Sequence, residues 1–196
     1  MRNIITGILT LVFIAGMGAF AWKACATDEP PKQTEEKPTG GGEAAGGGEA
    51  AAGGGDCCKA GDTTPTLDLI KATPKGGLHN PYADKVTDAA FAEEGHKTYL
   101  SAGCNGCHGG GGGGGMCPPL TNDTWVYGPD DDTLFRLVAL GSDGLKAAGY
   151  HRVKQEVVVG PMPPFGGILK TSDQLWKIIT FMRSVNPSSV GKPPLQ

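Results

Sequence analysis

The sequence has no excess of positive charge, and the chain is short. Its 17 lysine and arginine residues are outnumbered by 20 aspartate and glutamate residues, which gives a formal net charge of -3 at pH 7. This balance excludes a strongly basic nucleic-acid-binding protein. With 196 residues, the chain is also too short for a large enzyme with a cofactor domain of its own.

Glycine and proline are abundant instead, and they are unevenly distributed. The 33 glycines and 15 prolines make up close to a quarter of the chain, roughly twice the ordinary share of about 12%. Ten glycines lie between Gly40 and Gly61, and seven follow one another from Gly109 to Gly115. The remaining sequence is sufficient for one small domain.

Residues 1–26 have the pattern of an export signal or a membrane anchor. An apolar stretch from Ile4 to Trp22 lies between Arg2 and Lys23, and Ala24-Cys25-Ala26 follows as a small-x-small cleavage site. The stretch is longer than the core of most signals and nearly long enough to span a bilayer. Both interpretations place the rest of the chain outside the cytoplasm, in the periplasm, and residues 4–22 are the part that could contact the membrane.

Residues 27–76 lack a usable hydrophobic period. They contain the imperfect repeat GGGEAAGGGEAAAGGG and an excess of acidic over basic residues. Such a composition buries too little apolar surface to offset the entropy of the chain. We therefore expect a disordered Pro/Glu/Gly-rich linker, acting either as a tether or as an inert spacer.

The most specific motif is Cys104-Asn105-Gly106-Cys107-His108. The C-x-x-C-H spacing is typical of covalent c-type haem attachment, in which both thiols add to the haem vinyl groups and the histidine binds the iron as proximal ligand. A redox dithiol or half a zinc site is the alternative. The chain has no second C-x-x-C with zinc spacing and no βαβ pattern around the motif. The motif predicts one covalently bound haem c.

Around this motif the chain resembles the class I cytochromes c, from Val86 to Pro187. A helix precedes the motif in that family, with glycine and an aromatic residue four positions apart. Here Thr87 is a candidate N-cap, and Phe91, Gly95 and Tyr99 follow at helical spacing.

A second family helix should cross the first at Gly95. Thr171-Ser172-Asp173-Gln174 has the pattern of a capping box, and Asn186-Pro187 ends the segment. Its apolar residues at helical spacing are Leu175, Trp176, Ile179, Met182 and Val185. The resemblance implies that residues 77–196 form an all-α, cytochrome c-like domain around one haem.

The resemblance also implies a sixth iron ligand. Residues 160–165, Gly-Pro-Met-Pro-Pro-Phe, resemble the family loop that supplies an axial methionine, so the expected iron ligands are His108 and Met162. His79 and His151 are rival candidates. Ligation by histidine and methionine implies a low-spin iron of relatively high reduction potential.

Further family features are expected around the haem. Pro119-Leu120 matches a pair whose carbonyl orients the proximal imidazole, and Trp125 and Tyr127 occupy the stretch that lines the haem near its propionates. The run from Gly109 to Gly115 departs from the family pattern. We interpret it as a loop that allows close approach of a partner protein or of the haem edge.

Two other groups of residues leave alternatives open. Asp130-Asp131-Asp132 is interpreted as the start of a short helix that ends at Gly141, in preference to a metal site. Outside the cytoplasm, Cys117 could pair with Cys57 or Cys58, and a vicinal Cys57–Cys58 bond is the other option.

These features indicate an electron-transfer protein rather than an enzyme, because both axial positions of the haem are filled. The expected partners are a dehydrogenase or quinol-oxidising complex as donor and a terminal oxidase as acceptor. Within the family, the resemblance is greatest to periplasmic cytochromes that serve quinoprotein (PQQ-dependent) alcohol dehydrogenases. The alternatives are a tethered haem subunit of a membrane respiratory complex, and a haem enzyme or gas sensor with a displaceable sixth ligand.

Overall fold

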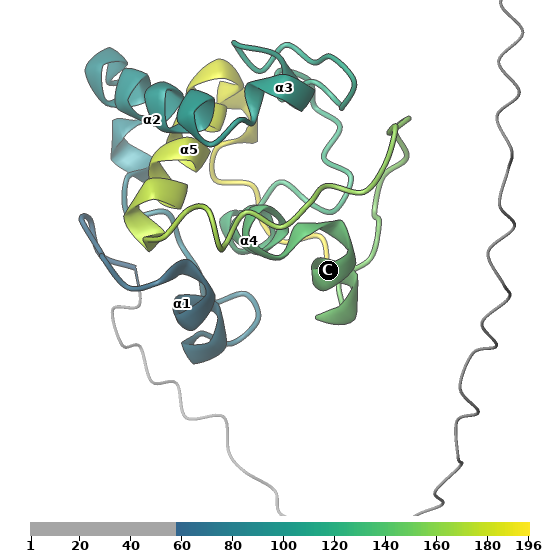
Figure 1. The fold of residues 1–196 in the computed structure, drawn as a ribbon, viewed down its shortest axis with the longest axis horizontal. Coiled ribbons are helices and arrows are strands. Elements are labelled where there is room, and N and C mark those ends of the chain that lie inside the picture. The colour runs from purple at the N-terminus through teal and green to yellow at the C-terminus, as the bar shows by residue number, and fades with distance from the viewer. Residues whose placement is uncertain (1–57) are drawn as a thin grey trace, which may run out of the picture. The chain divides into compact units, whose positions relative to one another are not determined.

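The structure, a computed structural model, describes residues 58–196 (Figure 1). The expectations for residues 1–26, and those for the linker up to residue 57, lie outside the described residues. Within residues 58–196 all regular secondary structure is helical and there is no strand, which confirms the all-α fold. The elements are α1 (Thr66–Ala72), a 3-10 turn (Ala83–Lys85), α2 (Ala89–Ser101), α3 (Asn105–His108), α4 (Asp131–Ala147), α5 (Ser172–Val185) and a second 3-10 turn (Pro187–Ser189).

The crossing of α2 and α5 organises the fold, as the family resemblance predicted (Figure 1). A Cβ atom added at Gly95 would lie 2.1 Å from the backbone oxygen of Lys177, so only glycine permits this approach. Next to the crossing, the rings of Tyr99 and Phe181 pack with their centroids 5.1 Å apart. The N-cap of α2 is Asp88 rather than Thr87, because the Asp88 carboxylate accepts hydrogen bonds from two backbone amides of the first turn.

The predicted capping box of α5 is present. The Thr171 side chain accepts from the backbone amide of Gln174, and the Gln174 side chain accepts in return from the Thr171 amide. The helix ends at Asn186 as expected. Trp176 is fully buried and packs against Phe135 of α4, with ring centroids 4.4 Å apart. α5 therefore joins α2 and α4 in one core.

α4 does not end at Gly141, where we expected it to stop. Gly141 has a φ of 71°, which breaks the helical geometry, but the chain resumes a helix and continues to Ala147. A Cβ atom at Gly141 would lie 2.6 Å from the backbone oxygen of Met162. The break therefore makes room for the loop that carries Met162.

The linker prediction is wrong for residues 58–76, which are ordered and include α1. Thr66 of α1 is buried and its hydroxyl donates to the backbone oxygen of Leu169 at 2.7 Å. Just before α1, the Thr64 carbonyl accepts from the amide and the hydroxyl of Ser172, at the start of α5. A seven-residue helix has too little periodicity to be recognised in a sequence, and its order comes from tertiary packing.

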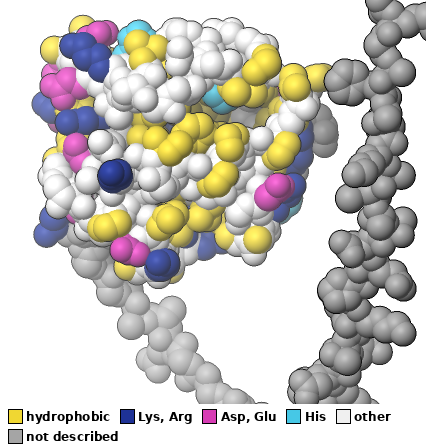
Figure 2. All heavy atoms as spheres, viewed as in Figure 1, with side chains coloured by type: hydrophobic (Ala, Val, Ile, Leu, Met, Phe, Trp, Pro, Cys, Tyr) yellow, Lys and Arg dark blue, Asp and Glu magenta, His cyan; other side chains and the backbone are white. Residues whose placement is uncertain are grey.

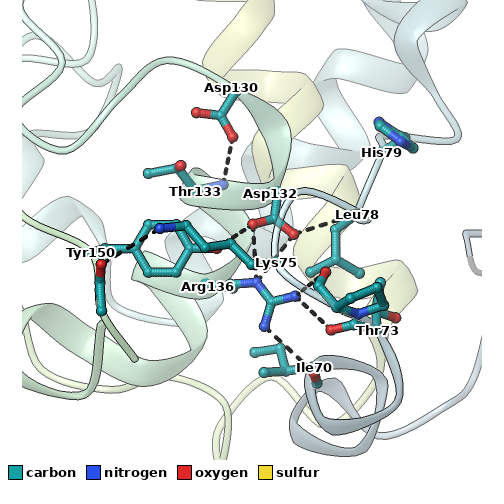
Figure 3. A network of polar contacts seen from close by, with 12 residues as sticks. Ile70, Thr73, Lys75, Leu78, His79, Asp130, Asp132, Thr133, Arg136 and Tyr150 are labelled. Carbon is teal, nitrogen blue, oxygen red and sulfur yellow. Dashed lines mark hydrogen bonds and ion pairs between the residues drawn. The ribbon is translucent and has the colours of Figure 1, made fainter. Parts of the chain in front are cut away.

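Residues 58–76 form an N-terminal extension of the domain, and a buried polar network joins this extension to α4 (Figure 3). The Arg136 guanidinium donates to both carboxylate oxygens of Asp132, at 3.1 and 3.0 Å, and to the backbone oxygens of Thr73 and Pro74. The Tyr150 hydroxyl donates to Asp132 as well. Asp132 thus does more than complement the dipole of α4, because it pairs with the arginine that anchors the extension.

Candidate functional site

A cavity of about 540 Å³ opens between α3, α4 and the loop that carries Met162. Its wall is mainly apolar, and apolar side chains gather on the face between α3 and α4 (Figure 2). Ile178 and Met182 of α5 contribute to the wall, and the charged side chains on it are Asp143, Lys146 and Arg152. A cavity of this size and character is suited to a large apolar group with an ionic edge.

The C-x-x-C-H motif forms one helical turn, with Cys104 as the N-cap of α3. The His108 amide donates to the Cys104 carbonyl at 3.0 Å, and this four-residue spacing puts the two side chains on the same side of the turn. Both line the cavity. Burial raises the pKa of the Cys104 thiol to about 11, so it is a neutral thiol near pH 7.

The structure orients the imidazole of His108 through Nδ1. This atom lies 2.8 Å from the backbone oxygen of Pro118. A carbonyl oxygen can only accept, so the ring proton is on Nδ1 and the lone pair of Nε2 is available to a metal. We expected the carbonyl of the Pro119-Leu120 pair in this role, and that assignment is wrong by one residue. Pro119 itself lines the cavity.

The loop from Gly109 to Gly115 is held by specific hydrogen bonds beside the motif. The Tyr99 hydroxyl donates to the Gly109 carbonyl at 2.6 Å, and the Gly114 amide donates to the His108 carbonyl at 2.8 Å. Gly109, Gly112 and Gly114 have positive φ values, so the backbone requires glycine there. At Gly110, Gly111 and Gly113 an added Cβ would meet nothing within 4 Å. The suggested approach of a partner at this loop remains a prediction.

Met162 lies on the wall of the same cavity as His108. Its loop is fixed to the break in α4, because the Ser142 amide donates to the Met162 carbonyl at 2.9 Å and the Met162 amide donates to the Ser142 hydroxyl at 3.0 Å. The rivals His79 and His151 are exposed and are not among the described residues that line the cavity. Met182, expected at the helix crossing, does line it.

Trp125 and Tyr127 are both buried and both line the cavity. The indole Nε1 of Trp125 is buried and finds no hydrogen-bond acceptor in residues 58–196. A buried donor without an acceptor is costly, so this atom suits an acceptor on a bound group. The sequence did not predict that Pro118 orients His108 or that Ser142 holds the Met162 loop. Only Gly141, the residue before Ser142, indicated that α4 is interrupted there.

These residues fit a covalently attached haem. The wall supplies a buried thiol at Cys104, an imidazole with Nε2 available at His108, a thioether at Met162 and an orphan donor at Trp125. Within residues 58–196, no cluster of three or more His, Cys, Asp or Glu side chains could hold a bare metal ion.

The remaining cysteines are separated in the fold. Cys117 lines the cavity and forms no disulfide with a described cysteine, whereas the sulfur of Cys58 accepts a hydrogen bond from the amide of His79. The alternative in which Cys117 pairs with Cys58 is not formed in the described residues. Cys57 lies outside the described residues.

Over residues 58–196, the longest helices are too short or too polar to cross a bilayer.

Comparison with known proteins identifies similar subunits of cytochrome c oxidases. Residues 90–182 match the family model described as cytochrome C oxidase, cbb3-type, subunit III. A curated relative, the cbb3-type cytochrome c oxidase subunit CcoP of Azospirillum brasilense, is 34% identical over 81 residues, which are 38% of this chain and 27% of the relative. The chain thus spans about a quarter of that protein's length. No solved structure matches the chain.

Both matches name a cbb3-type oxidase, and they agree with the C-x-x-C-H motif and the helical fold. The match from residue 90 to residue 182 includes the C-x-x-C-H motif, the Met162 loop and most of the two crossing helices. Neither match supports the association with quinoprotein alcohol dehydrogenases.

Proposed function

We propose that residues 90–182, which match the family model of cbb3-type oxidase subunit III, form a c-type cytochrome domain, and that the chain is a tethered electron-transfer subunit of a respiratory oxidase complex. It would carry one haem c, since the sequence contains a single C-x-x-C-H. The haem domain would lie in the periplasm, held to the membrane through residues 4–22 and the linker.

The observation that carries this proposal is the shared wall of Cys104, His108 and Met162 around one apolar cavity. Cys104 and Cys107 would hold the haem through thioethers, and His108 and Met162 would be its axial ligands. When bound, the haem supplies a one-electron couple. The Pro118 carbonyl keeps the His108 proton on Nδ1, and the wall around the haem would be mainly apolar.

The oxidase is preferred as the partner because both comparisons point to one. A free carrier would also fit the cavity, but the N-terminal apolar stretch and the linker favour a domain that stays attached. Two axial ligands leave no open iron position for a substrate, which supports electron transfer over an enzyme or gas sensor. Ready binding of carbon monoxide to the ferrous protein at neutral pH would favour the sensor instead.

Replacing Met162 by alanine tests the axial ligand. We expect Met162→Ala to abolish the methionine-to-iron charge-transfer absorption of the ferric protein and to lower the reduction potential, because the thioether favours ferrous iron. Absorption spectroscopy and a redox titration of the purified holoprotein measure both effects.

Two other methionines provide matched controls. Met116 is 61% exposed, so Met116→Ala should leave band and potential unchanged. Met182 shares the cavity wall, so Met182→Leu keeps its volume and removes its sulfur. If the charge-transfer absorption survives in Met162→Ala and is lost in Met182→Leu, the iron ligand is Met182 of α5 and not Met162.

The oxidase partnership is tested by co-purification from membranes. The full-length chain with a C-terminal affinity tag should retain a cbb3-type oxidase, and reduced holoprotein should be oxidised by that preparation in the presence of oxygen. Intact mass reports the haem count and the state of the N-terminus at the same time. Recovery of the holoprotein in the soluble periplasmic fraction, without an oxidase, would contradict the tethered subunit and favour a free carrier.

A further inference from the structure

Three thiols surround the haem-attachment turn, although covalent attachment uses two. Cys104 is 7% exposed and lines the cavity. Cys117 also lines the cavity, whereas Cys107 is not among the described residues on its wall. Cys107 therefore differs from the other two thiols, because they line the cavity and it does not.

Cys107 is in direct contact with Cys117. The Cys117 amide donates to the Cys107 carbonyl at 3.1 Å. Burial, followed by the neighbouring side chain of Cys107, raises the pKa of the Cys117 thiol. The backbone hydrogen bond makes the two backbones neighbours at these residues, and a disulfide requires Cα atoms about 4.4–6.8 Å apart.

We propose that Cys107 and Cys117 form a disulfide in the haem-free chain, and that this bond blocks one of the two haem attachments. The bond occupies the sulfur of Cys107, so this sulfur cannot add to a vinyl group until the disulfide is reduced. The proposal rests on the proposed haem attachment at Cys107. Cys117 then makes haem loading depend on the thiol redox state of the compartment.

The bond forms by thiol–disulfide exchange with an oxidised dithiol. One of the two cysteines attacks the oxidant's disulfide as a thiolate and forms a mixed disulfide with it. The other cysteine then attacks the protein sulfur of that mixed disulfide and releases the oxidant as a dithiol. The pair loses two electrons and two protons, and the oxidant takes them up as it becomes a dithiol. A reduced dithiol reverses the reaction and returns both thiols. Compartments outside the cytoplasm contain such oxidants.

The competing bond between Cys104 and Cys107 is disfavoured by access. Cys104 is buried, and its amide is tied to the Tyr99 carbonyl at 3.2 Å. Cys107 and Cys117 are each half-buried, so a solvent-borne oxidant reaches them more easily. Exchange rates depend on access to the thiols, and access favours the pair formed by Cys107 and Cys117.

The position of Met116 allows a direct test. The full-length chain is prepared without haem, oxidised with glutathione disulfide, blocked with an alkylating agent and cleaved after methionine with cyanogen bromide. Cleavage after Met116 separates Cys107 from Cys117, so residues 117–162 stay joined to the preceding fragment only through a disulfide. We expect the fragments to remain joined in most molecules and to separate on reduction.

Single substitutions identify the partner of Cys117. Cys107→Ser should abolish the joined fragments, whereas Cys104→Ser and Cys58→Ser should retain them. Separate fragments in the oxidised wild-type chain, or joined fragments in Cys107→Ser, would overturn the proposal. Because this assay uses haem-free protein, its result does not depend on whether the proposed haem function is correct.

A second readout follows haem loading in cells that carry the attachment machinery. Added thiol reductant should raise the fraction of wild-type chain with two thioethers, as read from intact mass. The rise should be smaller for Cys117→Ser, in which the competing thiol is absent. Equal rises in the two proteins would contradict a role of Cys117 in haem loading.

Discussion

Tyr99 links the α2–α5 crossing to the turn formed by the C-x-x-C-H motif. Its side chain is 1% exposed, and its hydroxyl donates to the carbonyl of Gly109, the residue after His108. Burial is the main cause that raises the pKa of Tyr99 from 10.0 to about 12. The phenol is thus kept neutral where it supports the motif.

This shift predicts a loss of stability in strong base. Between pH 10 and pH 12 the unfolded chain ionises Tyr99 while the folded chain does not, so the free energy of unfolding should fall as the pH rises through this window. Below pH 10 the contribution is fully present and constant. Urea unfolding of the holoprotein from pH 8 to pH 12 measures it, and Tyr99→Phe should show a shallower fall. An equal fall in both proteins would contradict the assignment.

The junction between α4 and the N-terminal extension depends on one buried ion pair. The side chains of Arg136 and Asp132 are 7% and 3% exposed, whereas those of Lys71 and Asp68 on α1 are 77% and 58% exposed. Removing one partner of a buried pair leaves a charge without compensation, while an exposed pair contributes little. The two pairs therefore form a matched comparison.

We expect Arg136→Met to lower the free energy of unfolding by about 3–5 kcal/mol, because it strands Asp132 and frees the carbonyls of Thr73 and Pro74. Lys71→Met should change it by less than about 1 kcal/mol. Urea unfolding measures both variants. Limited proteolysis should also cleave the segment before residue 80 faster in Arg136→Met. Equal effects of the two substitutions would show that the network does not anchor the extension.

The described domain as a whole is close to electrically neutral. Residues 58–196 contain 13 basic and 13 acidic side chains. Long-range steering of a partner requires a large charge of one sign, and salt screens it over a Debye length. Docking of this domain should therefore depend on local contacts around the cavity more than on overall attraction.

This neutrality predicts a weak salt dependence of electron transfer. Between about 50 and 200 mM salt, the second-order rate constant for oxidation of the reduced holoprotein by its partner should change less than about threefold. Stopped-flow spectroscopy over a salt series measures it. A steep decrease with salt would instead reveal a charged docking patch that the overall balance conceals.

Much of the domain could be predicted from local patterns. The C-x-x-C-H motif, the capping box at Thr171, the helix around Gly95 and the loop at Met162 each depend on residues close together in the sequence, and each lies where expected. Capping and helical periodicity are short-range interactions, so sequence reasoning captures them. The roles of His108 and Met162 as iron ligands remain predictions.

Other features depend on contacts between distant segments, and only the folded chain decided them. Composition placed residues 58–76 in the linker, but Arg136, more than sixty residues further on, holds their carbonyls. The Pro118 carbonyl reaches His108 because the glycine loop folds back on the motif, and Gly141 interrupts α4 because the Met162 loop packs there. The same folding back brings Cys117 against Cys107. Local sequence is thus sufficient for the haem motif and its helices, whereas long-range packing determines which groups meet around them.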